Sequence, residues 1–419
     1  METHYKYILI GGMAAAFAAQ NIREGDPDGN ILLVGDEPHP PYDRPPLSKQ
    51  MLAKDDYQPD DAYCKYDDFY PKNRVELRRA VRVSAVDRGA RSVTTDDGHT
   101  YTYEKLLLAT GARARALDVP GANRTGVFLL RTIENSVAIR QALQASRKIA
   151  VIGSGYLGME VAADALTRGL GVAIIERKAH AWPRFASEQL GRFIQSAYEA
   201  KGGKFFTNAE VASIDGERDS GPARGVTLKD GRKIEADAVI AAVGAALNTD
   251  LGLEAGLEGD AEQGLTTDEY LQTSDPNIWA AGDIACFQDV ALGKRWHVEH
   301  HLNAKWQGQA VGKIMAGDRT PFERVPYFFS DFLDLHMILR GDSEGGKSAA
   351  IVGEMASGEF TELYADEDGR LLMGVSISRN EPSLDPISDT LERLIQARVN
   401  IKGREQEIGA EGFKLESLG

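Results

Sequence analysis

Residues 148–176 read KIAVIGSGYLGMEVAADALTRGLGVAIIE, and the rest of the chain can be interpreted outward from this stretch. It predicts an apolar strand (149–152), a glycine turn (153–158), a helix, and a second apolar strand (172–175) that ends at Glu176. In a dinucleotide-binding unit of this order, the first glycine makes the tight turn and the second lets the backbone approach the pyrophosphate. The third lets helix and strand pack closely. The alternative is a glycine-rich turn that binds no nucleotide.

The same stretch predicts which coenzyme is bound. The helix N-terminus favours phosphates, and an acidic residue about 20 positions after the glycines accepts a hydrogen bond from the ribose 2′-OH. Glu176 follows Gly155 by 21 positions. We therefore predict NAD(H), with NADH preferred because a carboxylate repels a 2′-phosphate, although Arg177 and Lys178 would weaken that preference. The predicted NAD contacts are Gly153, Gly155, Tyr156, Leu157, Gly158, Glu160, Glu176 and Gly244.

Composition and charge limit the class of protein. The chain has 419 residues, 42% hydrophobic and 26% charged, so two or three folded domains are expected. A formal charge of −15 argues against nucleic acid or an anionic membrane as the main partner. The longest uncharged run, between Lys6 and Arg23, is too short for a membrane span, and we expect no signal peptide. Cys64 and Cys286 form no CxxC motif, which favours a reducing, cytoplasmic location.

Residues 7–34 repeat the order of the central stretch. A strand (7–10), the turn Gly11-Gly12, a helix (14–24) and a strand (30–34) predict a second nucleotide-binding unit. Whichever glycine is aligned first, one glycine of the GxGxxG pattern is missing, although small residues after the turn still permit close helix packing. The residues predicted to contact the nucleotide here are Gly11, Gly12, Ala14, Ala15, Asp36 and Glu37.

Further motifs accompany the two units, whose first glycines lie 142 positions apart. They are PYDRPPLSK (41–49), KLLLATG (105–111), FLLRTIEN (128–135), IWAAGD (278–283), EHHLNA (299–304) and PYFFSD (326–331). With these motifs the chain resembles the two-nucleotide flavoproteins, in which FAD binds first and an inserted domain binds NAD(P). More narrowly, it resembles the branch that holds the ferredoxin, putidaredoxin and rubredoxin reductases, monodehydroascorbate reductase and apoptosis-inducing factor.

The resemblance implies further FAD contacts. Asp283 would hold the ribityl chain of the flavin, Arg131 would point at the flavin, and Phe329 stands where many relatives have tryptophan against it. The implied FAD residues outside the first unit are Arg44, Lys49, Ala109, Thr110, Gly111, Arg131, Gly282, Asp283, Glu299, His300 and Phe329. Glu299 with His300 and His301 could instead suggest a metal site. Adjacent histidines point to different faces of a helix, so we predict no metal.

The expected fold is α/β, with two Rossmann-like dinucleotide-binding domains and a C-terminal α+β domain. The predicted FAD domain is discontinuous (1–112 and 243–318), the NAD domain spans 113–242, and the C-terminal domain spans 319–419. In the last of these we expect strands at 349–354, 360–365 and 371–376, a helix at 385–398, and a polar, poorly ordered tail after Ile401.

The chemistry expected of such a chain is hydride transfer from NADH to the flavin. Lys49 and Glu160 are the predicted catalytic pair. The Lys49 ammonium would stabilise negative charge on the reduced flavin, and Glu160 would orient Lys49 and the nicotinamide amide. The alternative is that both are ordinary solvated side chains.

The electron acceptor is the open step. The chain has no CxxxxC after the first nucleotide unit, so a dithiol relay is not expected. The resemblance favours a ferredoxin-type iron–sulfur protein of an oxygenase system, docked on a cationic rim for which Arg44, Arg295, Lys305 and Arg340 are candidates. Alternatives are a monodehydroascorbate reductase, a quinone diaphorase or NADH oxidase, and an NADH redox sensor similar to apoptosis-inducing factor. A monomer and a homodimer are both compatible with the sequence.

Overall fold

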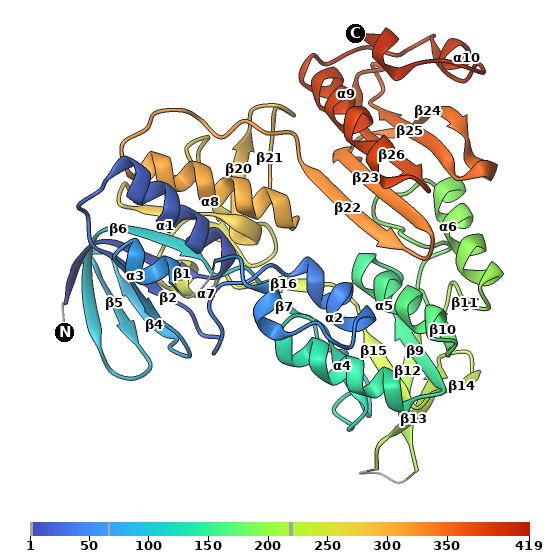
Figure 1. The fold of residues 1–419 in the computed structure, drawn as a ribbon, viewed down its shortest axis with the longest axis horizontal. Coiled ribbons are helices and arrows are strands. Elements are labelled where there is room, and N and C mark those ends of the chain that lie inside the picture. Colours follow the sequence, from blue (N-terminus) through green and yellow to red (C-terminus); the bar gives the residue numbers. More distant parts are fainter. Residues whose placement is uncertain (1–2, 66–67, 218–220) are drawn as a thin grey trace. The chain divides into compact units, whose positions relative to one another are not determined.

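The computed structural model describes residues 3–65, 68–217 and 221–419, which form two compact units (Figure 1). Unit 1 comprises Met1–Asp43, Asp60–Arg113 and Ala246–Tyr327, and unit 2 comprises Arg44–Pro59, Ala114–Ala245 and Phe328–Gly419. Unit 1 contains a mixed sheet with a parallel centre and unit 2 contains a parallel sheet, both with helices between the strands, so the predicted α/β fold class is confirmed. The predicted division into three domains stays a prediction.

The main sheet of unit 1 has the order β3-β2-β1-β6-β5-β4, and β19 also pairs with β6. Its strands are β1 (His4–Gly11), β2 (Ile31–Val34), β3 (Val75–Arg78), β4 (Val83–Asp87), β5 (Ser92–Thr95), β6 (Thr100–Ala109) and β19 (Ile278–Ala280). Around β1 the strands run parallel, with Ile8 opposite Leu32 in β2 and Leu106 in β6. All three side chains are buried, as expected where both faces of a parallel sheet are covered.

Helices α1 (Met13–Gly25) and α8 (His301–Met315) lie side by side in unit 1 (Figure 1). Their backbones come so close that a Cβ atom at Gly308 would lie 2.4 Å from the Ala14 carbonyl oxygen. Glycine is therefore required there. The other elements of this unit are α3 (Phe69–Lys72), α7 (Asp250–Glu254), β17 (Gly259–Asp260), β18 (Gly264–Thr266), the 3-10 turn η3 (Gly282–Ile284), β20 (Ala285–Asp289) and β21 (Lys294–Trp296).

Unit 2 is built on a parallel sheet of order β11-β10-β9-β15-β8. Its strands are β8 (Val127–Leu129), β9 (Lys148–Ile152), β10 (Gly171–Ile175), β11 (Lys204–Phe206) and β15 (Ala238–Ala241). The helices are α4 (Ile133–Ala145), α5 (Tyr156–Thr167) and α6 (Glu188–Ala200), and a separate sheet contains β12 (Val211–Gly216), β13 (Ala223–Leu228) and β14 (Lys233–Glu235). The sequence pattern places the central strand–turn–helix–strand of this unit to within two residues.

The short segment 44–59 also belongs to unit 2. It contains the 3-10 turn η1 (Pro45–Ser48) and the helix α2 (Gln50–Ala53). Two side chains of α4 hold it, because Ser136 Oγ donates to the Leu47 carbonyl at 2.6 Å and Arg140 Nη1 donates to the Tyr57 carbonyl at 3.0 Å. The loop that carries Lys49 is therefore fixed from both ends.

The C-terminal part of unit 2 is an antiparallel sheet of order β22-β23-β26-β25-β24. Its elements are β22 (Tyr327–Phe332), β23 (Leu335–Gly341), β24 (Lys347–Glu354), β25 (Glu359–Ala365), β26 (Leu371–Ser378) and the helix α9 (Leu384–Gln396). Sequence reasoning found the last three strands and α9. It missed β23, whose residues are almost all buried, so that no alternation of apolar and polar residues marks the strand.

The prediction that the tail after Ile401 is poorly ordered is wrong. A short helix, α10 (Glu405–Ile408), packs against β24, and Ile408, Leu415 and Leu418 are all buried. These three apolar side chains anchor the segment. Because they are scattered among many charged residues, they leave no helix-like or strand-like spacing of apolar residues in the sequence. No helix among the described residues is long and apolar enough to cross a membrane.

Candidate functional site

The glycine turn of unit 2 leaves a helix N-terminus open. Gly153 has φ +99°, and a Cβ there would lie 2.3 Å from the Ala242 carbonyl oxygen, while a Cβ at Gly158 would lie 2.2 Å from the Gly153 carbonyl oxygen. Gly155 is the N-cap of α5, has no side-chain cap, and a Cβ placed on it would meet nothing within 4 Å. The turn thus offers free backbone N–H groups and space beside them, which fits the phosphates of a dinucleotide.

Glu176 directly follows β10, close to its predicted place, but its carboxylate already accepts hydrogen bonds. Oε2 accepts hydrogen bonds from the Ser154 backbone N–H at 3.0 Å and from Ser154 Oγ at 2.6 Å, and Oε1 accepts one from the Lys178 N–H at 2.8 Å. Glu176 is 7% exposed and Ser154 is fully buried. The acidic residue expected at the ribose is therefore held against the glycine turn, a contact that sequence reasoning did not foresee.

The other predicted NAD residues surround the same turn. The Tyr156 ring lies against two further aromatic rings, with centroids 3.7 Å from that of Phe328 and 4.7 Å from that of Phe185. Leu157 is 41% exposed, and Gly244 adopts φ +106° after β15. All eight predicted NAD contacts lie in unit 2. Their contact with NAD stays a prediction.

Lys49 and Glu160 form an ion pair inside unit 2. Lys49 Nζ lies 2.8 Å from Glu160 Oε1 and 3.6 Å from Asp331 Oδ2, and the Lys49 and Glu160 side chains are only 11% and 6% exposed. Ser330 Oγ donates to Glu160 Oε1 at 2.6 Å, and Ser48 Oγ donates to Oε2. The predicted pair is thus real as a contact, and the alternative of two solvated side chains does not hold.

Three elements build this ion pair. Glu160 comes from α5, Ser48 and Lys49 come from η1 and the residue after it, and Ser330 and Asp331 come from β22. The Lys49 ammonium also lies 5.4 Å from the centroid of the Phe329 ring. Sequence reasoning missed the roles of Ser48, Ser330 and Asp331, although all three stand inside the quoted PPLSK and FFSD motifs.

Unit 1 explains the missing glycine of the first nucleotide motif. Gly11 has φ +135° and its Cβ would lie 2.0 Å from the Ala109 carbonyl oxygen, while Gly12 is the N-cap of α1 and its Cβ would meet nothing within 4 Å. These are the features of Gly153 and Gly155, respectively. The turn is one residue shorter than that of unit 2, and both of its glycines are present. Ala15, fully buried three residues after Gly12, takes the place of the third glycine.

The flavin motifs of unit 1 carry polar atoms that lack partners. Gly282, with φ +78°, donates its N–H to Gln307 Oε1 at 2.8 Å, and Asp283 beside it is 9% exposed. Among the described residues, the buried Asn303 Oδ1 and Gln307 Nε2 have no hydrogen-bond partner. Unsatisfied amide atoms beside an open helix N-terminus fit a polar ligand such as FAD, because buried polar atoms are otherwise nearly always bonded.

The predicted FAD residues divide between the two units. Arg44, Lys49, Arg131 and Phe329 lie in unit 2, and Arg44 donates to the Arg131 carbonyl there. The others lie in unit 1: Gly11, Gly12, Ala14, Ala15, Asp36, Glu37, Ala109, Thr110, Gly111, Gly282, Asp283, Glu299 and His300. His300 is the N-cap of α8, so Glu299 precedes the helix, and Glu299 Oε1 lies 3.3 Å from His297 Nε2. The role of each stays a prediction.

Neither cysteine is placed for thiol chemistry. Burial raises the pKa of the Cys64 thiol to about 12 and also raises the pKa of Cys286. Both thiols are therefore protonated near neutral pH, where a reactive cysteine would be a thiolate. Four cations were predicted to form the docking rim, and the prediction for Arg340 is wrong. Its side chain is 8% exposed and lies 3.1 Å from Glu392, so it cannot face a docking partner.

Two glycine turns, each open at the start of a helix, are the features expected of a protein that binds two dinucleotides. A family model described as pyridine nucleotide-disulphide oxidoreductase matches residues 5–308, and the chain belongs to this family. It is thus an NAD(P)H-dependent oxidoreductase that binds FAD and NAD(H), which confirms the predicted cofactors.

Known relatives match this chain over almost its whole length. The chain is 33% identical to a probable ferredoxin reductase of Castellaniella defragrans, over 89% of this chain and 90% of that protein. It is 32% identical to the putidaredoxin reductase of Pseudomonas putida, over 90% of each. Among solved structures, a covalent putidaredoxin reductase–putidaredoxin complex matches with 29% identity and a TM-score of 0.92, covering 99% of this chain and 98% of that one.

Proposed function

We propose that the protein is an NADH-dependent flavoprotein reductase, which passes electrons from NADH through its bound FAD to a ferredoxin-type iron–sulfur protein of an oxygenase system. The observation that carries this proposal is the full-length match to the reductase of the putidaredoxin complex. The net reaction oxidises one NADH to NAD⁺, reduces two one-electron acceptors and releases one proton.

The ion-paired lysine gives the chain a fixed positive charge for this reaction. Bound FAD would supply the chemistry that converts a hydride into single electrons. In unit 2, Glu160 and Asp331 hold the Lys49 ammonium, and two serine hydroxyls orient Glu160 in turn. A charge held by the protein in this way needs no reorganisation when negative charge develops beside it.

The thiols support a one-electron acceptor. The chain has two cysteines, Cys64 and Cys286, which are free and stand in no CxxxxC motif, and this supports an acceptor other than a dithiol of this chain. Free thiols also support our proposal that the protein works in a reducing compartment, which we take to be the cytoplasm. Both a monomer and a homodimer are compatible with this proposal.

Anaerobic stopped-flow spectroscopy tests the proposal. NADH should bleach the flavin absorbance rapidly, and a [2Fe–2S] ferredoxin with a cytochrome c reporter should then sustain many turnovers. Quinone or monodehydroascorbate turnover without ferredoxin reduction would replace the proposal with a diaphorase-type reductase. A long-lived reduced charge-transfer complex without turnover would replace it with a redox sensor.

A further inference from the structure

The hydrogen bonds around Glu176 leave little of its carboxylate for a ligand. An ionised carboxylate offers about four acceptor positions, two on each oxygen. Ser154 fills both positions on Oε2 with its backbone N–H and its hydroxyl, and the Lys178 N–H fills one on Oε1. One position remains, on Oε1. The carboxylate can therefore accept one more hydrogen bond, in one direction.

Two cations stand directly after this carboxylate. Arg177 and Lys178 are exposed, and among the described residues neither side chain forms an ion pair. A 2′-phosphate near Glu176 would therefore meet two available positive charges and one fixed negative charge. Discrimination between NADH and NADPH depends on whether that negative charge stays in place, because the cations alone would favour the phosphate.

The Ser154 hydroxyl is the side-chain donor that keeps Glu176 in place. Its hydrogen bond of 2.6 Å to Oε2 is the shortest of the three, and the residue is fully buried. The two backbone donors belong to every variant, whereas the hydroxyl is specific to this residue. A side chain inside the glycine turn thus acts on the coenzyme through the residue at the end of β10.

We propose that Ser154 is a specificity-determining residue, which fixes the Glu176 carboxylate so that it accepts the ribose 2′-OH of NADH and rejects the 2′-phosphate of NADPH. This inference rests on the proposed function only in taking NADH as the reductant. Ser154 is a positioning residue. It acts through Glu176, so its loss should change the choice of coenzyme and leave the maximum rate of flavin reduction unchanged.

The test compares Ser154→Ala with the unchanged protein, both holding FAD. Titration calorimetry measures the Kd of NAD⁺ and of NADP⁺ for the oxidised protein, and stopped-flow reduction measures the limiting rate at saturating NADH. We expect the ratio of the two Kd values to move toward NADP⁺ by about tenfold, the size of one hydrogen bond to a charged group. The limiting rate should be unchanged. Because binding is measured without an acceptor, failure of ferredoxin reduction would not affect the result.

Two further variants separate positioning from general stability. Ser376→Ala removes another fully buried hydroxyl of unit 2, bonded to Thr361 Oγ1 at 2.8 Å, and should leave both Kd values unchanged. Glu176→Gln should itself relax the preference, and adding Ser154→Ala to it should change the ratio little further, because the two residues act as a unit. An unchanged ratio in Ser154→Ala, or an effect of the same size in the Glu176→Gln background, would overturn the inference.

Discussion

Lys49 and Glu160 show how one buried contact depends on its neighbours. Removing two charges from water costs more than their attraction returns unless further hydrogen bonds satisfy them. Glu160 receives such bonds from Ser48 and Ser330, and the ammonium of Lys49 has Asp331 as a second anion. The pair is therefore stable only as part of this group of five residues from three elements.

Replacing Glu160 by Gln should be costly for both stability and rate. The change keeps the size of the side chain and leaves the buried Lys49 without its nearest anion, a loss of about 3–5 kcal/mol. We also expect flavin reduction by NADH to slow by at least about tenfold, because Lys49 is no longer held in position. Chemical denaturation and stopped-flow reduction measure the two effects.

The matched control is Glu235→Gln, which breaks the exposed pair with Lys148. Those side chains are 83% and 58% exposed, and the pair spans 2.9 Å. This variant should unfold and react like the unchanged protein, since exposed ion pairs contribute little. If Glu160→Gln were equally harmless, the buried pair would have neither role.

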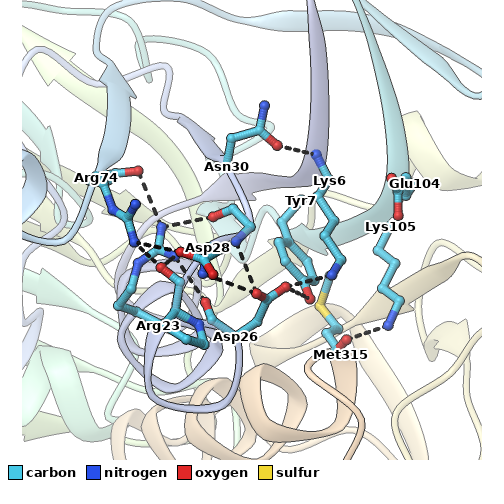
Figure 2. Close-up of polar contacts among 12 residues, drawn as sticks. Lys6, Tyr7, Arg23, Asp26, Asp28, Asn30, Arg74, Glu104, Lys105 and Met315 are labelled. Atoms are coloured by element: carbon cyan, nitrogen blue, oxygen red, sulfur yellow. Dashed lines mark hydrogen bonds and ion pairs between the residues drawn. The ribbon is translucent and has the colours of Figure 1, made fainter.

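At the scale of elements, the Asp26 carboxylate links β1, the end of α1 and the start of β2 in unit 1 (Figure 2). Asp26, at the C-terminal end of α1, accepts hydrogen bonds from Lys6 Nζ at 2.7 Å and Tyr7 OH at 2.8 Å, both on β1. It also accepts from the Gly29 N–H at 3.0 Å, just before β2. The Lys6 hydrogen bond is the largest cause that lowers the pKa of Asp26, and the same contact raises the pKa of Lys6.

The pH dependence of this group follows from the two shifts. Because the pKa of Asp26 is lowered by folding, its contribution is present above the unfolded value of about 3.9 and is lost as the pH falls below it. Because the pKa of Lys6 is raised, its contribution is present below the unfolded value of about 10.4 and is lost as the pH rises through the folded one. The contact therefore stabilises unit 1 between these limits.

Asp26→Asn should lower the free energy of unfolding by about 1–3 kcal/mol at pH 7, the size of hydrogen bonds to a charged group. The difference from the unchanged protein should shrink toward pH 3, where Asp26 of the unfolded chain takes up a proton that the folded protein does not bind. Urea unfolding at both pH values measures it. Asp28→Asn, at a side chain 92% exposed, is the control and should change stability little. A loss that does not depend on pH would contradict the electrostatic explanation.

Two glycines of unit 1 should separate folding from FAD binding. Gly12 has open space where a Cβ would lie, but its φ of −101° and ψ of −124° fall outside the main regions open to other residues, so Gly12→Ala should keep the fold at a modest cost in stability. Its methyl group would occupy the approach to the helix N-terminus, and we expect the Kd for FAD to rise by about tenfold or more, a cost of about 1.4 kcal/mol. Visible absorbance of the purified protein and circular dichroism measure the two properties.

Gly308→Ala should act on the fold instead. Its Cβ would press on the Ala14 backbone, so α1 and α8 must separate, at a cost of about 1–3 kcal/mol. Its melting temperature should therefore fall while its flavin content is kept, whereas Gly12→Ala should lose flavin. Equal flavin content in Gly12→Ala and the unchanged protein would show that no phosphate approaches this turn.

At the scale of the whole molecule, we expect charge to govern the encounter with the acceptor. The formal charge of −15 repels an acidic ferredoxin, so productive docking requires a local cationic patch. Reduction of an acidic ferredoxin should then slow by about tenfold between low and high ionic strength, through the association rate, since salt screens opposite charges. Turnover with a neutral quinone should barely change. A ferredoxin rate indifferent to salt would exclude electrostatic docking.

Much of the molecule follows from local pattern. The strand–glycine–helix–strand order at 148–176, the repeat at 7–34 and the last three strands are visible because strands and helices leave periodic signals in consecutive residues. The shortened turn at Gly11-Gly12, the strand β23 and the packed C-terminal tail are not visible. The turn lacks one residue of the usual motif, β23 is buried on both faces, and the tail is held by a few scattered apolar contacts. None of these leaves a periodic pattern of apolar and polar residues.

By itself, the sequence determined the α/β class, the two nucleotide-binding units, the family and its cofactors, and the identity of Lys49 and Glu160 as a pair. Only the tertiary structure decided that Ser48, Ser330 and Asp331 surround that pair, that Ser154 holds Glu176, and that Arg340 is buried. The reason is distance along the chain. Ser330 and Glu160 are 170 positions apart, and such contacts arise from the packing of elements, which no local pattern records.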